Sequence, residues 1–205
     1  SEISQYLLGF CLCIYCQSAA ESAGADAKKL ASKISKALNN LLAEEDLWIG
    51  KELNIDNLVL IFGIDIKTWI LGQQRTLVNL HKEITKLAHS AEATLRWVDQ
   101  SPLIGGLDRS WRIGIDPKGL GQVVDVIEPL LYRQSTSEII ELAQSYLSII
   151  QPPEKITGIL RPTYPDNSSQ VEIIFILFKS SILIFKDSVN NDNDFIVKNC
   201  FSIFE

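Results

Sequence analysis

The sequence predicts a mainly α-helical fold: a bundle of about five to six helices over residues 1–150. A proline-containing linker is expected over residues 151–165, and a strand-rich tail over residues 166–205. Two observations predict this order. Apolar residues recur at steps of three and four through much of the first region, which is the helical period. The tail, in contrast, contains no Ala, Gly, Arg or Pro.

The first expected element is a helix from Ile3 to Gln17, which is apolar nearly all round and is therefore predicted to be buried. Its apolar run from Leu7 to Cys16 is too short to cross a bilayer, which takes about twenty residues. The run has the length of a signal-peptide core, but no basic residue precedes it. A buried helix is thus favoured over a processed targeting segment within residues 1–20 and over an interfacial membrane anchor.

Two further helices are expected from apolar spacing and capping residues. An amphipathic helix is predicted over about residues 25–45, with Asp26 as its cap. A largely apolar element follows over residues 58–71, with Asp56 as its cap and a bend or break at Gly63.

The clearest periodicity predicts one long helix over residues 73–99, which Pro102 ends because the residue before proline avoids the α region. Its apolar stripe comprises Leu77, Leu80, Ile84, Leu87, Ala91, Leu95 and Val98. A stripe this narrow is typical of a helix packed against one or two long partners. We therefore expect these side chains to be buried in the bundle.

Residues 101–121 form a glycine-rich, irregular middle in which Trp111–Ile115 is expected to be a short strand or an extended loop. Asp116 is a suitable cap for a helix that runs to about Tyr132 and kinks or ends at Pro129.

A capping box that begins at Ser135 predicts the last helix of the bundle, and Pro152 ends it. The side chains expected to face inward are Ile139, Ile140, Ala143, Tyr146, Leu147 and Ile150.

Two interpretations of the tail, residues 166–205, stay open. Its Ile, Phe and Val suit a small β unit. Alternatively the tail is non-native coding sequence, because the missing residue types are those with G/C-rich codons. In that case the domain ends near residue 165.

Three of the four cysteines, Cys11, Cys13 and Cys16, lie in the N-terminal apolar run. Zinc needs four ligands, and on one continuous helix Cys11 would not share a face with the other two. We interpret all three as buried core residues rather than as zinc ligands or lipidation sites, and we expect no metal and no cofactor. The spacing is not that of a secreted disulfide framework, so we expect an intracellular (cytoplasmic) protein.

His81 and His89 are the only histidines, and they are too far apart on the long helix to share a metal. Either one is a possible general base, which requires a hydroxyl or thiol within hydrogen-bonding reach. No nucleophile elbow and no phosphate-binding glycine pattern is present. The chemistry of the sequence therefore argues against an enzyme.

Mixed charge, tryptophan and irregular backbone coincide only around residues 97–116. Loops with such content commonly carry binding groups, with Asp and Arg orienting a polar ligand and Trp stacking on it. The candidate binding residues are Trp97, Asp108, Arg109, Trp111, Arg112 and Asp116. A net charge of −6 offers no basic face for nucleic acid.

These observations favour a non-enzymatic helical protein–protein interaction module, a scaffold or adaptor, with a protein partner and no nucleic acid. Two alternatives stay open. One is a membrane-associating bundle whose apolar N-terminal helix meets a membrane surface. The other is an enzyme that uses a histidine of the long helix with acids of residues 99–125.

Overall fold

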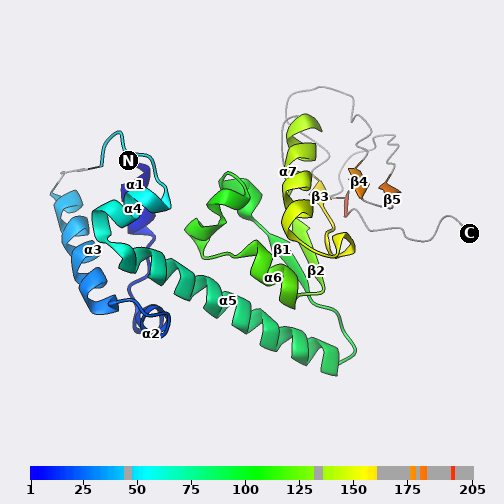
Figure 1. Ribbon diagram of the computed structural model, residues 1–205, viewed down its shortest axis with the longest axis horizontal. Coiled ribbons are helices and arrows are strands. Elements are labelled where there is room, and N and C mark those ends of the chain that lie inside the picture. The colour runs from blue at the N-terminus through cyan, green and yellow to red at the C-terminus, as the bar shows by residue number, and fades with distance from the viewer. Residues whose placement is uncertain (44–47, 132–135, 161–175, 179–180, 184–194, 197–205) are drawn as a thin grey trace, which may run out of the picture. The chain divides into compact units, whose positions relative to one another are not determined.

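The computed structural model describes residues 1–43, 48–131, 136–160, 176–178, 181–183 and 195–196 of the chain. Within these residues the chain is mainly helical, as the sequence predicts (Figure 1). It divides into two compact units, Ser1–Leu77 and Val78–Glu205, and the boundary falls inside helix α5 (Ile64–Ser90). The predicted limits of the bundle, linker and tail at residues 150 and 165 stay predictions.

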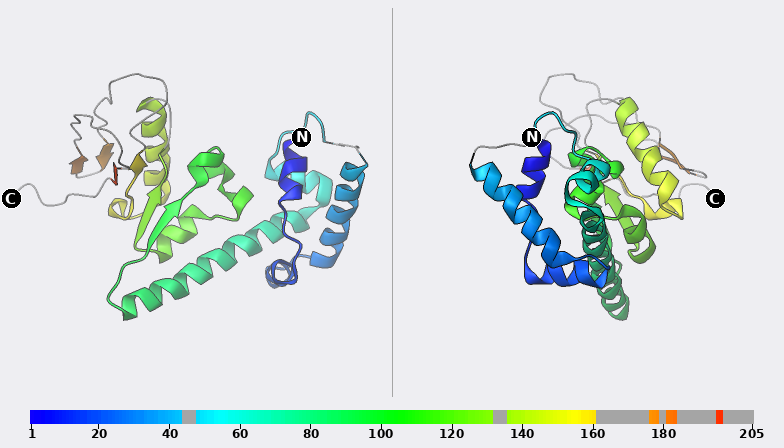
Figure 2. Two further views of the ribbon diagram at one scale, coloured as in Figure 1. Left: turned by 180° about the vertical axis from the view of Figure 1, so that it is seen from behind. Right: turned by 60° about the vertical axis from the view of Figure 1, so that its left-hand side comes forward.

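Among its described residues, the regular elements of the first unit are all helices. Its elements are α1 (Glu2–Leu8), α2 (Ile14–Ser22), α3 (Ala27–Leu42), α4 (Ile55–Phe62) and the first part of α5. Figure 2 shows the blue helices gathered around the cyan start of α5. The buried apolar side chains there include Ile3, Leu7, Leu30, Ile34, Leu58, Phe62, Ile66, Trp69 and Ile70.

The prediction of one buried helix from Ile3 to Gln17 is wrong, because the chain leaves the helix at Gly9. The next residue, Phe10, turns its ring towards Trp69, with 5.4 Å between the ring centroids. Helix α2 begins only after Cys13. The end of α1 thus coincides with contact between the half-buried Phe10 and the buried Trp69.

The amphipathic helix is confirmed as α3, whose cap is Asp26, since its carboxylate accepts a hydrogen bond from the Lys29 N–H at 3.1 Å. The cap of α4 is Asn54 rather than Asp56, which lies in the first turn of the helix. Gly63 is a break, with a φ of 93°, and α5 begins directly after it. A left-handed φ of this size favours glycine.

Helix α5 begins nine residues earlier than expected and ends nine residues earlier, at Ser90 rather than at residue 99. It continues through Gly72, where a Cβ would lie 2.8 Å from the backbone oxygen of Ala19. Beyond its end, Glu92 has a φ of 55°, and the Ala93 N–H donates to the Ala88 carbonyl at 2.9 Å. This is a Schellman-type termination, which usually has glycine at the left-handed position. Because Glu92 occupies that position here, the sequence carries no such signal for the end of the helix.

The second unit adds strands to its helices. After the end of α5 the elements are β1 (Arg96–Asp99), η1 (Ser101–Ile104), η2 (Leu107–Ile113), α6 (Pro117–Val123), β2 (Val126–Pro129), α7 (Thr136–Ile149), η3 (Pro153–Lys155) and β3 (Ile159–Leu160). Strands β1 and β2 lie side by side and run parallel, with Trp97 opposite Ile127 (Figure 1). Parallel bridges from Ile127 to Ile156 and from Leu130 to Ile159 extend the pairing on the other side of β2.

Three expectations for this unit are wrong. Residues 96–99 are strand rather than helix, and Trp111–Ile113 belong to a 3-10 helix rather than to a strand or extended loop. The helix that begins after Asp116 ends at Val123, and Pro129 ends a strand. The run of β-branched residues around Val126 suits a pleated sheet, and pairing with β1 outweighs helical continuation.

Helix α7 confirms the last predicted helix, although Ser135 lies outside the described residues. Its buried side chains include Ile139, Leu142, Ala143 and Tyr146. Within residues 166–205 the structure describes only β4 (Ile176–Phe178), which pairs antiparallel with β5 (Ser181–Leu183), and β6 (Phe195–Ile196), which pairs with β3. The two interpretations of the tail otherwise concern residues outside those described.

Candidate functional site

The second half of α5 carries a row of exposed apolar side chains. Leu80, Ile84 and Leu87 are 54%, 37% and 70% exposed, and we call these three residues the outer stripe. They belong to the stripe that the sequence predicts to be buried, and Val98, from the same stripe, lies exposed on β1. The prediction of burial is therefore wrong for this part of the chain.

A different face of the same helix turns inward. His81 and Thr85 are buried, and Val78 lies beside Gly119 of α6. The His81 ring meets the Trp97 ring edge to face, with 4.3 Å between the centroids. Polar atoms on this face find partners within the protein, as when the Thr85 hydroxyl donates to the His81 carbonyl at 2.8 Å. Because His81 and Thr85 occupy the inward face, Leu80 and Leu87 lie on the neighbouring face, which is exposed to solvent.

The outer stripe has the spacing of a coiled-coil seam. Its steps of four and three are the a and d positions of a heptad, and half-buried Leu77 and exposed Ala91 continue the same spacing. From Leu77 to Ala91 the seam spans about 21 Å at the helical rise. A charged face borders it, on which Lys86 and Glu83 form an exposed ion pair at 2.6 Å.

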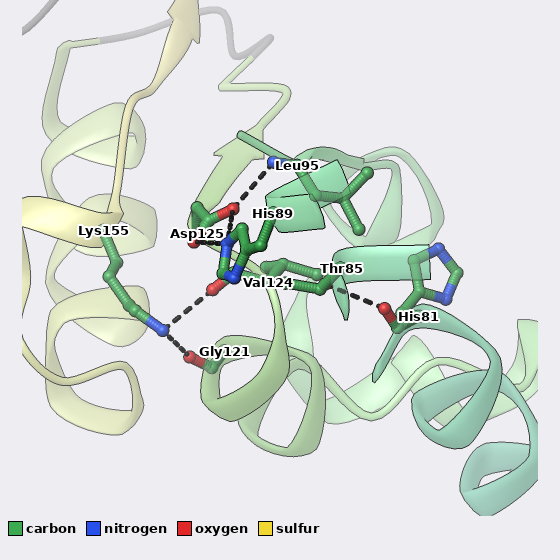
Figure 3. A network of polar contacts seen from close by, with 8 residues as sticks. All are labelled: His81, Thr85, His89, Leu95, Gly121, Val124, Asp125 and Lys155. Carbon is green, nitrogen blue, oxygen red and sulfur yellow. Dashed lines mark hydrogen bonds and ion pairs between the residues drawn. The ribbon is translucent and has the colours of Figure 1, made fainter. Parts of the chain in front are cut away.

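A polar network fixes the C-terminal end of α5 (Figure 3). The Nε2 atom of His89 lies 2.9 and 3.0 Å from the two carboxylate oxygens of Asp125, and the Leu95 N–H donates to Asp125 at 2.7 Å. Burial raises the pKa of Asp125, but the Leu95 N–H, His89 and Lys155 together outweigh it and hold that pKa below its usual value. The ammonium of Lys155 also donates to the carbonyls of Gly121 and Val124 at the end of α6.

A second polar cluster joins β1 to α7. The carboxylate of Asp99 is fully buried and accepts hydrogen bonds from the Ser101 N–H (2.8 Å), the Ser101 hydroxyl (2.6 Å) and the Tyr146 hydroxyl (2.7 Å). Arg96 donates to Glu128 across the β1–β2 pair, with its Nε at 2.8 Å. Both acids are engaged within the fold, so they hold the sheet and α7 together rather than present a site.

The six predicted binding residues do not all come together. Four of them, Asp108, Arg109, Trp111 and Arg112, share the short helix η2. Trp97 lies on β1 and is packed against His81, so it is not an open stacking platform.

The sixth residue, Asp116, precedes α6 without making a side-chain cap hydrogen bond, and its carboxylate occupies the space beside Gly119. The structure thus gathers the η2 residues as one group. Trp97 and Asp116 lie outside that group.

Sequence reasoning missed a cluster of thiols between α1 and α2. The sulfurs of Cys11, Cys13 and Cys16 all lie within 4.8 Å of one another, and Cys11 and Cys13 are exposed while Cys16 is half-buried. The interpretation of these cysteines as buried core residues is therefore wrong. The signal that was overlooked is Gly9, which ends α1 and frees Cys11 from the helical geometry that would have separated it from the others.

The thiols of the cluster differ in acidity. The pKa of Cys13 is lowered to about 7, first because the backbone N–H of Cys16 faces its sulfur and then because the neighbouring thiols lie beside it. The pKa of Cys16 is raised to about 12, first by burial and then by the sulfurs of Cys11 and Cys13. The lowered pKa increases the share of Cys13 that is thiolate at neutral pH, in contrast to Cys16.

No protein-family model matches the chain, and no curated protein and no solved structure is detectably similar to it. Among the helices of the described residues, none combines the length and the apolar composition that a membrane crossing requires. Function is therefore inferred from the residues and their geometry.

Proposed function

We propose that the chain is a non-enzymatic protein-interaction module, a scaffold or adaptor, whose outer stripe on α5 receives an amphipathic helix of a partner protein. The main support is the exposure of Leu80, Ile84 and Leu87 on a helix whose inner face is already packed. Large apolar side chains at heptad spacing suit the knobs-into-holes packing of a second helix. A partner with apolar residues at the same spacing would cover the stripe.

The size of the stripe limits how much it contributes alone. Full burial of a Leu or Ile side chain contributes about 1.5–3 kcal/mol. Three such side chains offset much of an association cost of about 4–15 kcal/mol but leave little excess. The partner must therefore also contact a second surface of the chain. The η2 residues Asp108, Arg109, Trp111 and Arg112 stay the predicted second contact.

The proposal is tested with charge placed in the stripe. The double variant Leu80→Asp/Leu87→Asp is compared with Leu60→Asp, since Leu60 on α4 is 77% exposed and lies outside the stripe. A partner captured from source-cell extract is identified, purified and titrated against each variant. We expect the double variant to weaken the dissociation constant at least about tenfold, which is about 1.4 kcal/mol, and Leu60→Asp to leave it unchanged. Equal affinity for the wild type and the double variant would contradict the proposal.

Two further measurements test whether η2 takes part in the interface and whether the stripe binds a second copy of the chain. Trp111→Ala and Arg112→Ala should weaken binding if η2 forms the second contact, and unchanged affinity in both would remove η2 from the interface. Light scattering on the purified chain tests self-association. A dimer that the double variant dissociates would show that the stripe binds a second copy, and it would overturn the assignment of a different protein partner.

The two other predicted functions have less support. For a membrane-associating bundle, the N-terminal apolar run would have to form one insertable helix, but it is divided between α1 and α2. For an enzyme, a histidine would have to reach a nucleophile, but His81 packs on Trp97 and His89 pairs with Asp125. Among the described residues, no hydroxyl or thiol hydrogen-bonds to the His89 ring.

A further inference from the structure

The segment between α1 and α2 is anchored at both ends. On one side the Phe10 ring packs against Trp69 and meets the Tyr6 ring at 5.7 Å, while the Phe10 N–H donates to the Leu7 carbonyl at 3.1 Å. On the other side the Gln17 side-chain amide donates to the Leu12 carbonyl at 2.7 Å. The backbone that carries the first two cysteines is therefore held against the helices on either side.

This backbone brings three soft ligands to one point. Cys11 lies in the connecting segment, Cys13 at the cap position of α2, and Cys16 in the first turn of that helix. Their sulfurs converge within 4.8 Å of one another at the surface, where a metal ion has access. Among the described residues, no histidine and no carboxylate joins the group. A site made only of thiols is chemically distinct from the oxygen-rich sites that Mg²⁺ and Ca²⁺ prefer.

We propose that Cys11, Cys13 and Cys16 form a binding site for one Cu(I) ion through three thiolate sulfurs. Soft thiolate ligands select soft cations such as Cu(I) over the hard divalent ions. Three sulfurs complete a trigonal shell for Cu(I), whereas a structural zinc ion requires four ligands. Because the segment is already held by Phe10 and Gln17, binding requires only small movements of the side chains and the loss of the thiol protons.

The site is tested by Cu(I) titration of the full, reduced chain under anaerobic conditions, with a chromogenic Cu(I) chelator as competitor. Free thiols are counted first, so that every cysteine is available. We expect the wild type to withdraw one equivalent of Cu(I) from the chelator, and X-ray absorption to find sulfur as the only type of neighbour. Cys11→Ser, Cys13→Ser and Cys16→Ser should each weaken binding by at least about tenfold, since even changes outside the ligand shell cost about 10–100-fold.

The matched control is Cys200→Ser, which removes a thiol distant in the sequence from the cluster and should bind Cu(I) as the wild type does. Cys11 and Cys13 are exposed, so their serine variants should keep the far-UV circular dichroism of the wild type. Loss of Cu(I) binding with an unchanged spectrum is then a loss of a ligand rather than of the fold.

Several results would overturn the proposal. One is failure of the wild type to compete with the chelator, and another is equal loss in Cys200→Ser. Retention of full affinity by the single-serine variants would show non-specific thiol binding. Stoichiometric Zn(II) binding without Cu(I) binding would assign the cluster to a different metal. An acyl chain on Cys11 or Cys13 in protein isolated from its source cells would show a lipidation site instead.

Discussion

The two halves of α5 carry apolar side chains at the same helical spacing, but in the first half these side chains are buried and in the second half they are exposed. In the first half Ile66, Trp69 and Ile70 are buried in the core of the first unit. In the second half the residues at heptad spacing, Leu80 and Leu87, face solvent. The inner face there is supplied by His81 and Thr85 instead. The contrast teaches that apolar periodicity locates a stripe on a helix but does not decide whether that stripe is buried or exposed.

The largest expected difference lies between a core residue and a stripe residue of this helix. Trp69→Ala should cost about 3–5 kcal/mol of unfolding free energy, because it leaves a large cavity in a fully buried site. Leu87→Ala should change the free energy by no more than about 0.5 kcal/mol, because its side chain is already in water. Urea unfolding followed by far-UV circular dichroism measures both. Similar losses in the two variants would show that the halves do not differ.

Alanine usually stabilises a helix relative to glycine, but at position 72 in the first half of α5 we expect the reverse. Gly72→Ala would place a Cβ 2.8 Å from the Ala19 backbone oxygen, so we expect a loss of about 1–3 kcal/mol from overpacking. At the exposed Asn79 in the second half, alanine should instead stabilise the helix by up to about 0.7 kcal/mol. The midpoints of urea unfolding show whether each variant is less or more stable than the wild type. A gain in Gly72→Ala would mean that α5 does not pack closely on α2.

The end of the second half should respond to pH through Asp125. Its pKa is lowered in the folded chain, so the folded state favours the charged carboxylate. The stabilisation, about 1 kcal/mol for such hydrogen bonds, should be fully present above the unfolded value of about 3.9. It should be lost as the pH falls through the folded pKa. Wild type and Asp125→Asn should therefore converge in acid, and a constant difference in their unfolding midpoints would contradict this assignment.

The smallest effect is expected where α5 ends. Glu92 has a φ of 55°, a conformation that costs an L-residue about 1–2 kcal/mol. Because glycine also gains freedom in the unfolded chain, Glu92→Gly should stabilise by only about 0.5–1 kcal/mol. Lys82→Gly, inside the helix, should destabilise by about 1 kcal/mol. Thermal unfolding of the pair measures the contrast, and destabilisation by Glu92→Gly would show that the turn does not have this conformation.

Sequence patterns correctly predicted an element where its capping residue and its buried apolar positions were both those expected. Helix α3 has its cap at Asp26 and its apolar positions Leu30 and Ile34 in the core, as expected. Contacts distant in the sequence decided the rest. The pairing of β1 with β2 removed residues 96–99 from the predicted helix. Residues 64–71, which the sequence pattern assigns to the preceding element, belong to α5, and Gly72 within that helix lies close to Ala19 of α2.

The candidate sites depended on such contacts even more strongly. The thiol cluster forms because α1 ends at Gly9 and Phe10 then contacts Trp69, and no spacing rule for cysteines predicts that end of the helix. Trp97, which was expected to bind a ligand, is engaged by His81 from a separate element. Residue types and spacing therefore predicted neither the exposure of the outer stripe nor the convergence of the three thiols.

The exposure of the outer stripe in the isolated chain is the observation on which the proposed function depends most directly. Methyl NMR with a soluble paramagnetic probe measures it residue by residue. The methyl groups of Leu80, Ile84 and Leu87 should relax strongly, while those of the buried Ile66 and Ile70 should be protected. Equal protection of both sets would contradict a free helical contact surface, and would show instead that the stripe is already covered within the chain.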